Sequence, residues 1–157
     1  NERRELERST MHHNTVCIDK MNQTQLWNGF RMARRSYCNI HEESSTSLSV
    51  SVNFYHNKFH HQRTIRNDNN SLCITDTVTG KIVQSKVCSF FIDYSLNSQI
   101  FVLPDSKFQI GPVILEIKGS THIEMEDYQQ ALDFNRLVVA KVIRIHFKDI
   151  LSSMIYV

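Results

Sequence analysis

Two carboxylates and a lysine in the stretch from Phe101 to Gly119 have the residue types of a metal-dependent hydrolytic site. Glu116 and Lys118 lie two residues apart in an apolar run, so strand alternation places both side chains on one face of a sheet. A turn over Gly111-Pro112 would fold Asp105 back toward them. Hard divalent cations prefer oxygen ligands, and a bound cation lowers the pKa of a water molecule. The spacing therefore indicates a Mg²⁺ or Mn²⁺ site that activates water.

Two helices are predicted among the elements that would position this stretch. Apolar residues between Gln23 and Tyr37 recur at helical spacing, with Phe30 in the apolar stripe. The outer face of this helix is basic, through Arg31, Arg34 and Arg35. A capping box, Thr121-x-x-Glu124, begins the second helix, in which Met125, Tyr128, Leu132 and Asn135 follow one helical stripe.

Several segments have strand patterns. Alternation is clearest in Leu48–Tyr55, and Thr79-Gly80 is read as the hairpin turn between two runs. The polar segment 56–70 is read as an exposed loop, whose Lys58 and Arg63 are candidates for contact with a nucleic-acid backbone. The remaining strands are predicted at Leu72–Val78, Lys81–Val87, Ser89–Leu96, Gln99–Leu103, Val113–Lys118, Leu137–Phe147 and Met154–Val157.

Pro104-Asp105, followed after ten residues by Glu116-x-Lys118, resembles the PD-(D/E)xK motif of restriction-endonuclease-like and RecB-type nucleases. A helix bearing Gln129 and Gln130 after this motif resembles the glutamine-bearing helix of RecB-type members. The resemblance covers about residues 101–147. The first predicted helix contains no Asp or Glu, which departs from the many family members with an acid there.

This resemblance implies roles for individual residues. Asp105 and Glu116 would ligate Mg²⁺ or Mn²⁺ together with the carbonyl oxygen of Ile117. Lys118 would orient the attacking water or stabilise charge on the phosphate. One of the two adjacent glutamines would face the site, and Gln129 is the one assigned here.

The predicted fold class is therefore α/β, with a mixed sheet flanked by helices, as in restriction-endonuclease-like proteins. Residues 1–20 are predicted to form a charged N-terminal segment or linker, and residues 21–157 a single globular domain with a nuclease core at 90–157. The predicted function is metal-dependent cleavage of phosphodiester bonds, with nucleic acid as partner. The basic residues predicted to contact it are Arg31, Arg34, Arg35, Lys58 and Arg63.

An alternative reading is a non-catalytic module: a β-rich, PH-like barrel capped by a helix. Its contacts would be with a protein or with single-stranded nucleic acid, for which Tyr55, Phe59 and the nearby basic residues would offer a stacking and phosphate-binding surface. The number of strands and the distance from Asp105 to Glu116 distinguish the two readings. The sequence leaves open whether the protein is an enzyme.

Composition sets wider limits. The chain has 157 residues, a formal charge of +2 and four cysteines without the C-x-x-C spacing of zinc sites. Free thiols are favoured over the three formal disulfide pairings, which indicates an intracellular protein, nuclear or cytoplasmic. The polar start lacks a signal-peptide pattern, and no apolar run approaches membrane-spanning length. A protein partner and the oligomeric state remain open.

Overall fold

The described part of the chain is mostly antiparallel β structure. The computed structural model describes residues 2–27, 31–54, 58–80, 85–133 and 136–156. Helical structure within these ranges is limited to α1 (Glu2–Glu7) and two 3₁₀ segments, η1 (Thr10–His12) and η2 (Tyr94–Gln99). The strands are β1 (Val16–Ile18), β2 (Gln25–Leu26), β3 (Met32–Ala33), β4 (Tyr37–Glu43), β5 (Ser47–Phe54), β6 (Phe59–Asp68), β7 (Ser71–Gly80), β8 (Lys86–Ile92), β9 (Ile100–Leu103), β10 (Lys107–Ile110), β11 (Val113–Asp133) and β12 (Arg136–Tyr156).

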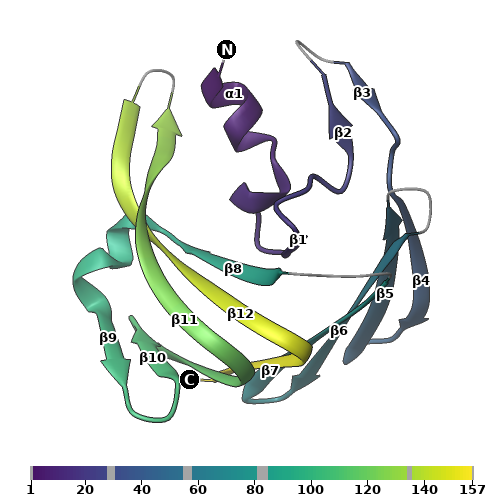
Figure 1. The fold of residues 1–157 in the computed structure, drawn as a ribbon. Coiled ribbons are helices and arrows are strands. Elements are labelled where there is room, and N and C mark those ends of the chain that lie inside the picture. The colour runs from purple at the N-terminus through teal and green to yellow at the C-terminus, as the bar shows by residue number, and fades with distance from the viewer. Residues whose placement is uncertain (1, 28–30, 55–57, 81–84, 134–135, 157) are drawn as a thin grey trace.

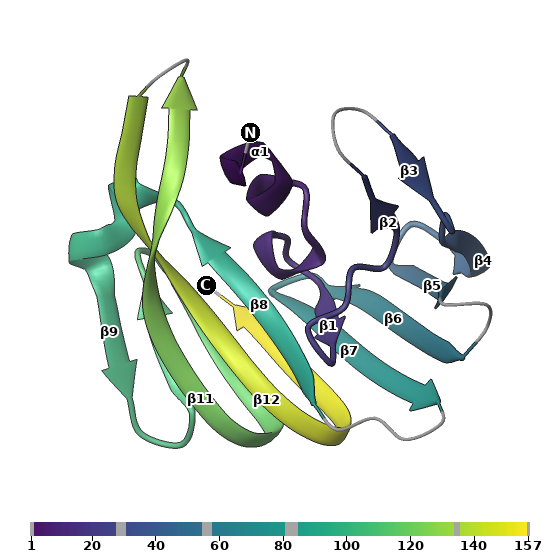
Figure 2. The ribbon, with the colours of Figure 1, turned by 45° about the horizontal axis from the view of Figure 1, so that its top comes forward.

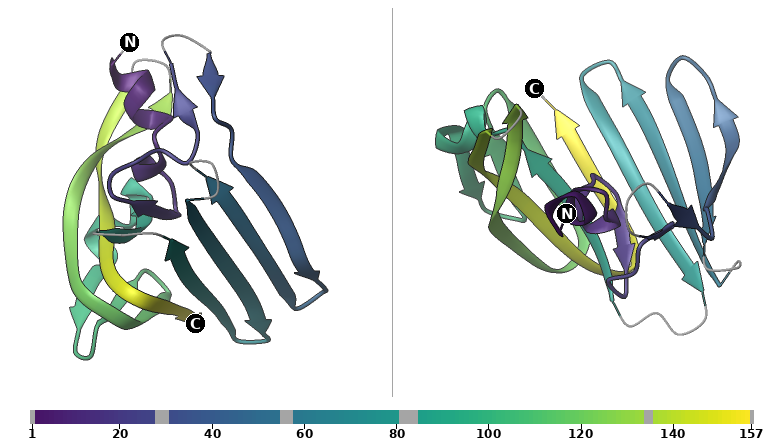
Figure 3. Two further views of the ribbon diagram at one scale, coloured as in Figure 1. Left: turned by 45° about the vertical axis from the view of Figure 1, so that its right-hand side comes forward. Right: turned by 90° about the horizontal axis from the view of Figure 1, so that it is seen from above.

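The two long strands β11 and β12 connect the two sides of a β-sandwich. Ten strands form one sheet in the order β4-β5-β6-β7-β12-β11-β10-β9, while β1 and β8 are attached along the first part of β12. The first half of β12 pairs with β8 and its second half with β7. Figure 1 shows the resulting curvature, which brings the β4–β7 side opposite the β11–β12 side. The segment α1–η1–β1 lies between the two sides (Figures 1 and 3).

The core fills the space between these two sides. Buried residues alternate with more exposed ones over parts of β12, and Ile143, Ile145 and Leu151 are fully buried. They pack with side chains from the other strands, including Val16, Ile18, Phe54, Phe59, Ile92, Phe108, Leu115 and Ile117. Period-two burial along a strand with one face on the core is the expected pattern for an antiparallel sandwich.

The predicted helix between Gln23 and Tyr37 is wrong. Its described residues form the short β2–β3 hairpin, with Gln25 opposite Ala33. Figure 2 shows this hairpin beside the N-terminal segment. The overlooked signal is Asn28-Gly29, a preferred hairpin dipeptide. Residues 28–30, and with them Phe30, lie outside the described residues.

The second predicted helix is also wrong, because β11 continues from Val113 to Asp133. Residues after Thr121 pair almost continuously with β12, for example Glu124 with Arg144. The prediction of Leu137–Phe147 as a strand is confirmed by β12. Hydrogen bonding to β12 imposes strand geometry on the part of β11 that was expected to be helical. Tertiary pairing thus overrides a local capping-box pattern. Asn135 lies outside the described residues.

Two other expectations fail in the middle of the chain. The segment predicted as a loop at 56–70 contains β6, paired on both sides. The expected hairpin at Thr79-Gly80 is absent from the described pairing: β7 runs through these residues, and β8 pairs with β1 and β12. The prediction of Leu48–Tyr55 as a strand is confirmed by β5 over its described residues.

The predicted α/β class is therefore wrong. A restriction-endonuclease-like fold needs helices flanking a mixed sheet, whereas the described pairings between strands are all antiparallel. The predicted boundary at residue 20 stays a prediction, although β1, N-terminal to it, is buried in the core. No helix among the described residues is long and apolar enough to cross a membrane.

Candidate functional site

The hairpin expected around Gly111-Pro112 is present. Strands β10 and β11 pair from Ile110 opposite Val113 outward, and Gly111 has a φ of +58°. Glu116 and Lys118 lie on one face as expected, with Lys118 Nζ 3.2 Å from Glu116 Oε1. The hydrogen bond from Lys118 is the main cause of a pKa of Glu116 below its usual value. This carboxylate is therefore held in a surface ion pair.

The β9–β10 turn, which holds Asp105, lies beside β11, because the Ile117 backbone N–H donates a 3.1 Å hydrogen bond to the Ser106 carbonyl. Asp105 is exposed in the β9–β10 turn with a φ of +58°. Gln129 lies far along β11, opposite Val139. Ile117 is buried in the core. No group of three or more His, Cys, Asp or Glu side chains that could hold a metal ion occurs within the described ranges. The Mg²⁺ or Mn²⁺ expectation stays an untested prediction.

The residues predicted to contact nucleic acid are in two kinds of environment. Arg31, Arg34 and Arg35 are exposed around β3, and Lys58 is exposed just before β6. Arg63 points inward instead, and its side chain is only 18% exposed. It is part of an internal network rather than of a surface available to phosphates.

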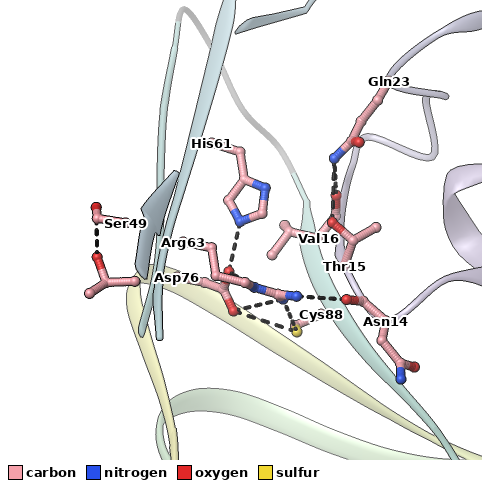
Figure 4. A network of polar contacts seen from close by, with 10 residues as sticks. Asn14, Thr15, Val16, Gln23, Ser49, His61, Arg63, Asp76 and Cys88 are labelled. Carbon is pink, nitrogen blue, oxygen red and sulfur yellow. Dashed lines mark hydrogen bonds and ion pairs between the residues drawn. The ribbon is translucent and has the colours of Figure 1, made fainter. Parts of the chain in front are cut away.

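This network centres on Asp76, which is fully buried on β7 (Figure 4). Its Oδ1 accepts hydrogen bonds from His61 Nε2 and Arg63 Nε, both at 2.7 Å, and its Oδ2 accepts one from Arg63 at 3.0 Å. The paired contact of one guanidinium with both carboxylate oxygens is the strong, directional form of this interaction. Burial alone would raise the pKa of Asp76, but the bonds from His61 and Arg63 lower it further than burial raises it.

The same network fixes a loop near the N-terminus. Arg63 Nη1 donates a 2.6 Å hydrogen bond to the backbone carbonyl of Asn14, and Asn14 Oδ1 accepts one from the backbone N–H of Phe91. Asn14 is thereby bound to β6 and β8 at once. Its neighbours His13 and Thr15 line a cavity, so the network positions one wall of that cavity.

The cysteines differ sharply in their surroundings. All four are free thiols: Cys17 and Cys88 are buried, Cys73 is partly exposed and Cys38 is exposed. Burial is the main cause that raises the pKa of Cys88 to about 12, and burial also raises the pKa of Cys17. Thiolates are the reactive form, so these two should be nearly inert in the folded protein.

Labelling of the native protein with a maleimide is therefore expected to modify Cys38 first, Cys73 more slowly, and Cys17 and Cys88 only after unfolding. Mass spectrometry of digested samples taken over time measures the order. A control reaction in denaturant should label all four. Rapid native labelling of Cys88 would contradict its placement in the core.

The cavity next to Asn14 has a volume of about 320 Å³ and a polar lining. Its side chains come from the end of α1, η1, the start of β1 and the base of the β2–β3 hairpin. They are Arg8, Thr10, His13, Thr15, Gln23, Thr24, Leu26 and Ser36. Hydrogen bonds tie the walls together: the Gln23 backbone N–H donates to Thr10 Oγ1, and the Ser36 backbone N–H donates to Thr24 Oγ1.

A second cavity, of about 300 Å³, lies over β8, β11 and β12. Two of its basic side chains are paired with carboxylates: Arg144 Nε lies 2.6 Å from Glu126 Oε2, and His146 Nε2 lies 3.0 Å from Glu124 Oε1. An anionic ligand would have to displace or approach those carboxylates. The first cavity has cationic and neutral donors and, among its described lining residues, no carboxylate. It is the better candidate for an anionic ligand.

Comparison with known proteins identifies the family. The model of the heparinase II/III-like C-terminal family matches residues 1–136. The chain belongs to this family. Two solved structures of heparinase III, one of them with methylated lysines, have a similar fold with a TM-score of 0.72 and 18% sequence identity over 99% of this chain. The chain covers 25% of each of those chains. No curated protein matched it.

Family membership overturns the nuclease interpretation, because both the family and the fold differ from those of PD-(D/E)xK enzymes. The prediction that this domain cleaves nucleic acid with the help of a metal ion is therefore wrong. The PH-like or nucleic-acid-binding alternative has no support from the comparisons either. Here Pro104-Asp105 lie in the β9–β10 turn of the sandwich, and Glu116 and Lys118 lie on β11.

Sequence reasoning missed the cavity, since it predicts only a charged N-terminal segment or linker over residues 1–20. A signal was nevertheless present. Val16, Cys17 and Ile18 form a short apolar run directly after the polar series Thr10, His13 and Thr15. A strand preceded by residues able to bind a ligand is a common arrangement at the rim of a β-sandwich, where loops hold functional groups.

Proposed function

We propose that this domain is the β-sandwich domain of a polysaccharide lyase of the heparinase II/III type, and that it binds an acidic polysaccharide. The observation that supports this most directly is the cavity of about 320 Å³ with Arg8 and His13 in its wall. Because the chain covers only 25% of the heparinase III chains, the proposal concerns binding and assigns no reaction to the domain alone.

The lining matches the chemistry of such a ligand. Acidic polysaccharides present carboxylate or sulfate groups along with many hydroxyls. A guanidinium binds these anions through paired, charge-assisted hydrogen bonds. The hydroxyls of Thr15 and Thr24 and the amide of Gln23 both donate and accept hydrogen bonds, which suits sugar hydroxyls.

The orientation of His13 supports the same role. Its Nδ1 lies 2.8 Å from the carbonyl oxygen of Ser9, and a carbonyl can only accept, so Nδ1 is the protonated atom. Nε2 is then the ring nitrogen that can accept from a sugar hydroxyl, or donate to an anion when the ring is charged. The anchoring of Asn14 by Arg63 keeps the adjacent His13 backbone in place.

Calorimetric titration with short uronic-acid oligosaccharides, sulfated and unsulfated, tests the proposal. We expect binding by the wild-type chain and about a tenfold loss of affinity in Arg8→Gln, which is the effect of removing one charge-assisted hydrogen bond of about 1.5 kcal/mol. His13→Gln is expected to weaken binding severalfold. A neutral glucan oligosaccharide should not bind.

The matched control is Arg66→Gln, which removes the same charge from an exposed position at the far end of β6. It should leave affinity unchanged. A single-stranded DNA oligonucleotide of equal charge serves as a second control for non-specific attraction. Equal binding of the DNA, or equal losses in Arg8→Gln and Arg66→Gln, would contradict a saccharide site in this cavity.

A further inference from the structure

The β2–β3 hairpin extends from one wall of the cavity of about 320 Å³. The residues at its base that line this cavity are Gln23, Thr24, Leu26 and Ser36. The contact between Thr24 and Ser36 closes the base, and further out the Trp27 backbone N–H donates a 3.0 Å hydrogen bond to the Arg31 carbonyl oxygen. Figures 1 and 2 show the hairpin projecting beside the N-terminal segment. A ligand chain that leaves the cavity on this side therefore meets the hairpin.

The charged residues of this hairpin are all basic. Between Gln23 and Tyr37 the sequence contains Arg31, Arg34 and Arg35 but no Asp or Glu. These three hairpin arginines are exposed, and none of them is in an ion pair within the described ranges. Their combined charge exceeds the formal charge of +2 of the whole chain, so the hairpin is a concentrated source of positive potential.

Another wall of the cavity, at the end of α1, has a different charge pattern. Helix α1 contains Glu2, Glu5 and Glu7 among its arginines, and Arg3 Nε lies 2.7 Å from Glu7 Oε1. Charges of both signs lie close together there, so their fields largely cancel. A polyanion that occupies the cavity is therefore attracted along the hairpin rather than along α1.

Arg34 and Arg35 lie close to the cavity. They directly precede the wall residue Ser36, and the Cα atoms of successive residues are about 3.8 Å apart, so both backbones are within about 8 Å of the wall. Arg31 lies further out along β3. The hairpin arginines thus continue outward from the cavity, and a polysaccharide with an anionic group in each repeat can contact them in turn.

Trp27 lies across the hairpin from Arg31 and is the single tryptophan of the chain. Its side chain is 51% exposed. An exposed indole offers a large apolar face to the C–H groups of a sugar ring, together with an N–H donor. Because side chains alternate along a strand, Trp27 and the cavity residue Leu26 lie on opposite faces of the hairpin. A change in the surroundings of Trp27 therefore reports a ligand that extends beyond the cavity.

We propose, on the basis of the function proposed above, that the hairpin arginines form a second binding surface for the part of an acidic polysaccharide that extends out of the cavity. The cavity binds one anionic sugar residue, and the hairpin binds the residues that follow, with Trp27 against a sugar ring. The domain therefore binds long chains more tightly than short ones. Because the hairpin arginines are exposed, added salt reduces this gain.

Calorimetric titration with a disaccharide and an octasaccharide of the same unsulfated uronic-acid repeat tests this surface. We expect the wild type to bind the octasaccharide more tightly by about tenfold or more, and Arg34→Gln/Arg35→Gln to lose about tenfold in affinity for the octasaccharide alone. Arg8→Gln should instead weaken the binding of both lengths. The octasaccharide, and not the disaccharide, should change the fluorescence of Trp27.

The matched control is Arg66→Gln/Lys148→Gln, which removes the same charge from exposed positions on β6 and β12 and should bind both lengths like the wild type. Failure of the wild type to bind either length would refute the cavity site and this surface together. Disaccharide binding without a gain in affinity for the octasaccharide would overturn the hairpin surface alone. So would a full gain in Arg34→Gln/Arg35→Gln, or an equal loss in the control variant.

Discussion

Replacing Asp76 with alanine is expected to destabilise the domain by about 3–5 kcal/mol, the usual consequence of leaving a buried charge without its partner. Asp76 is fully buried and accepts three hydrogen bonds from His61 and Arg63. Its removal leaves the Arg63 guanidinium, whose side chain is 18% exposed, without a carboxylate partner and with the Asn14 carbonyl as an acceptor. Urea unfolding followed by circular dichroism measures the change, which is a large share of the 5–15 kcal/mol typical of a domain.

A double-mutant cycle separates this mechanism from simple loss of packing. If the cost comes from the uncompensated guanidinium, Arg63→Met combined with Asp76→Leu should cost less than the sum of the two single changes, by about 1–3 kcal/mol. The matched control is Thr75→Ala, on the same strand with its side chain on the opposite face. Strict additivity in the cycle would contradict a coupled ion pair.

The pH dependence of the free energy of unfolding should also reveal the titration of Asp76. The pKa of Asp76 is lowered in the folded state, so its contribution is fully present above the unfolded value of about 3.9 and is lost as pH falls through the lower, folded value. The stability difference between wild type and Asp76→Ala should therefore be constant between about pH 5 and 7 and shrink in the acid range. A difference that grew on acidification would contradict a lowered pKa.

The same residues explain what the sequence could and could not predict. Regular alternation in Leu48–Tyr55 and Leu137–Phe147 identified two strands, because one face of each lies on the core. The hairpin at Gly111-Pro112 was also found, since turn chemistry is local. Strands without regular alternation were not predicted. In β6, His61 and Arg63 lie on the inner face, and such inward polar residues conceal the strand pattern.

The candidate site was harder to predict for a related reason. Arg63 and Asp76 are thirteen positions apart in the sequence and are brought face to face only by the pairing of β6 with β7. The cavity walls likewise come from four separate short elements. A short motif such as Pro104-Asp105 with Glu116-x-Lys118 is visible in one reading of the sequence, whereas a site assembled by long-range strand pairing is not.

Replacing Gly119 with alanine is expected to be about as damaging as the loss of Asp76, at about 2–5 kcal/mol. Gly119 has a φ of +87°, and a Cβ there would lie about 2.2 Å from the backbone carbonyl oxygen of Ile150. The register of β11 and β12 is irregular between Lys118 and Ser120, close to where β12 exchanges one neighbour for another. The close approach of the two backbones at this point leaves no room for a side chain.

Gly111→Ala provides the matched comparison, because it tests the cost of a positive φ without a clash between the new Cβ and backbone atoms. Gly111 also has a positive φ, +58°, but a Cβ there would meet the flexible Leu96 side chain at 3.1 Å rather than backbone. Gly111→Ala should therefore cost only the conformational penalty of about 1–2 kcal/mol. Thermal unfolding should give a clearly lower melting temperature for Gly119→Ala than for Gly111→Ala. Equal losses would contradict a steric clash between a side chain at position 119 and the Ile150 backbone.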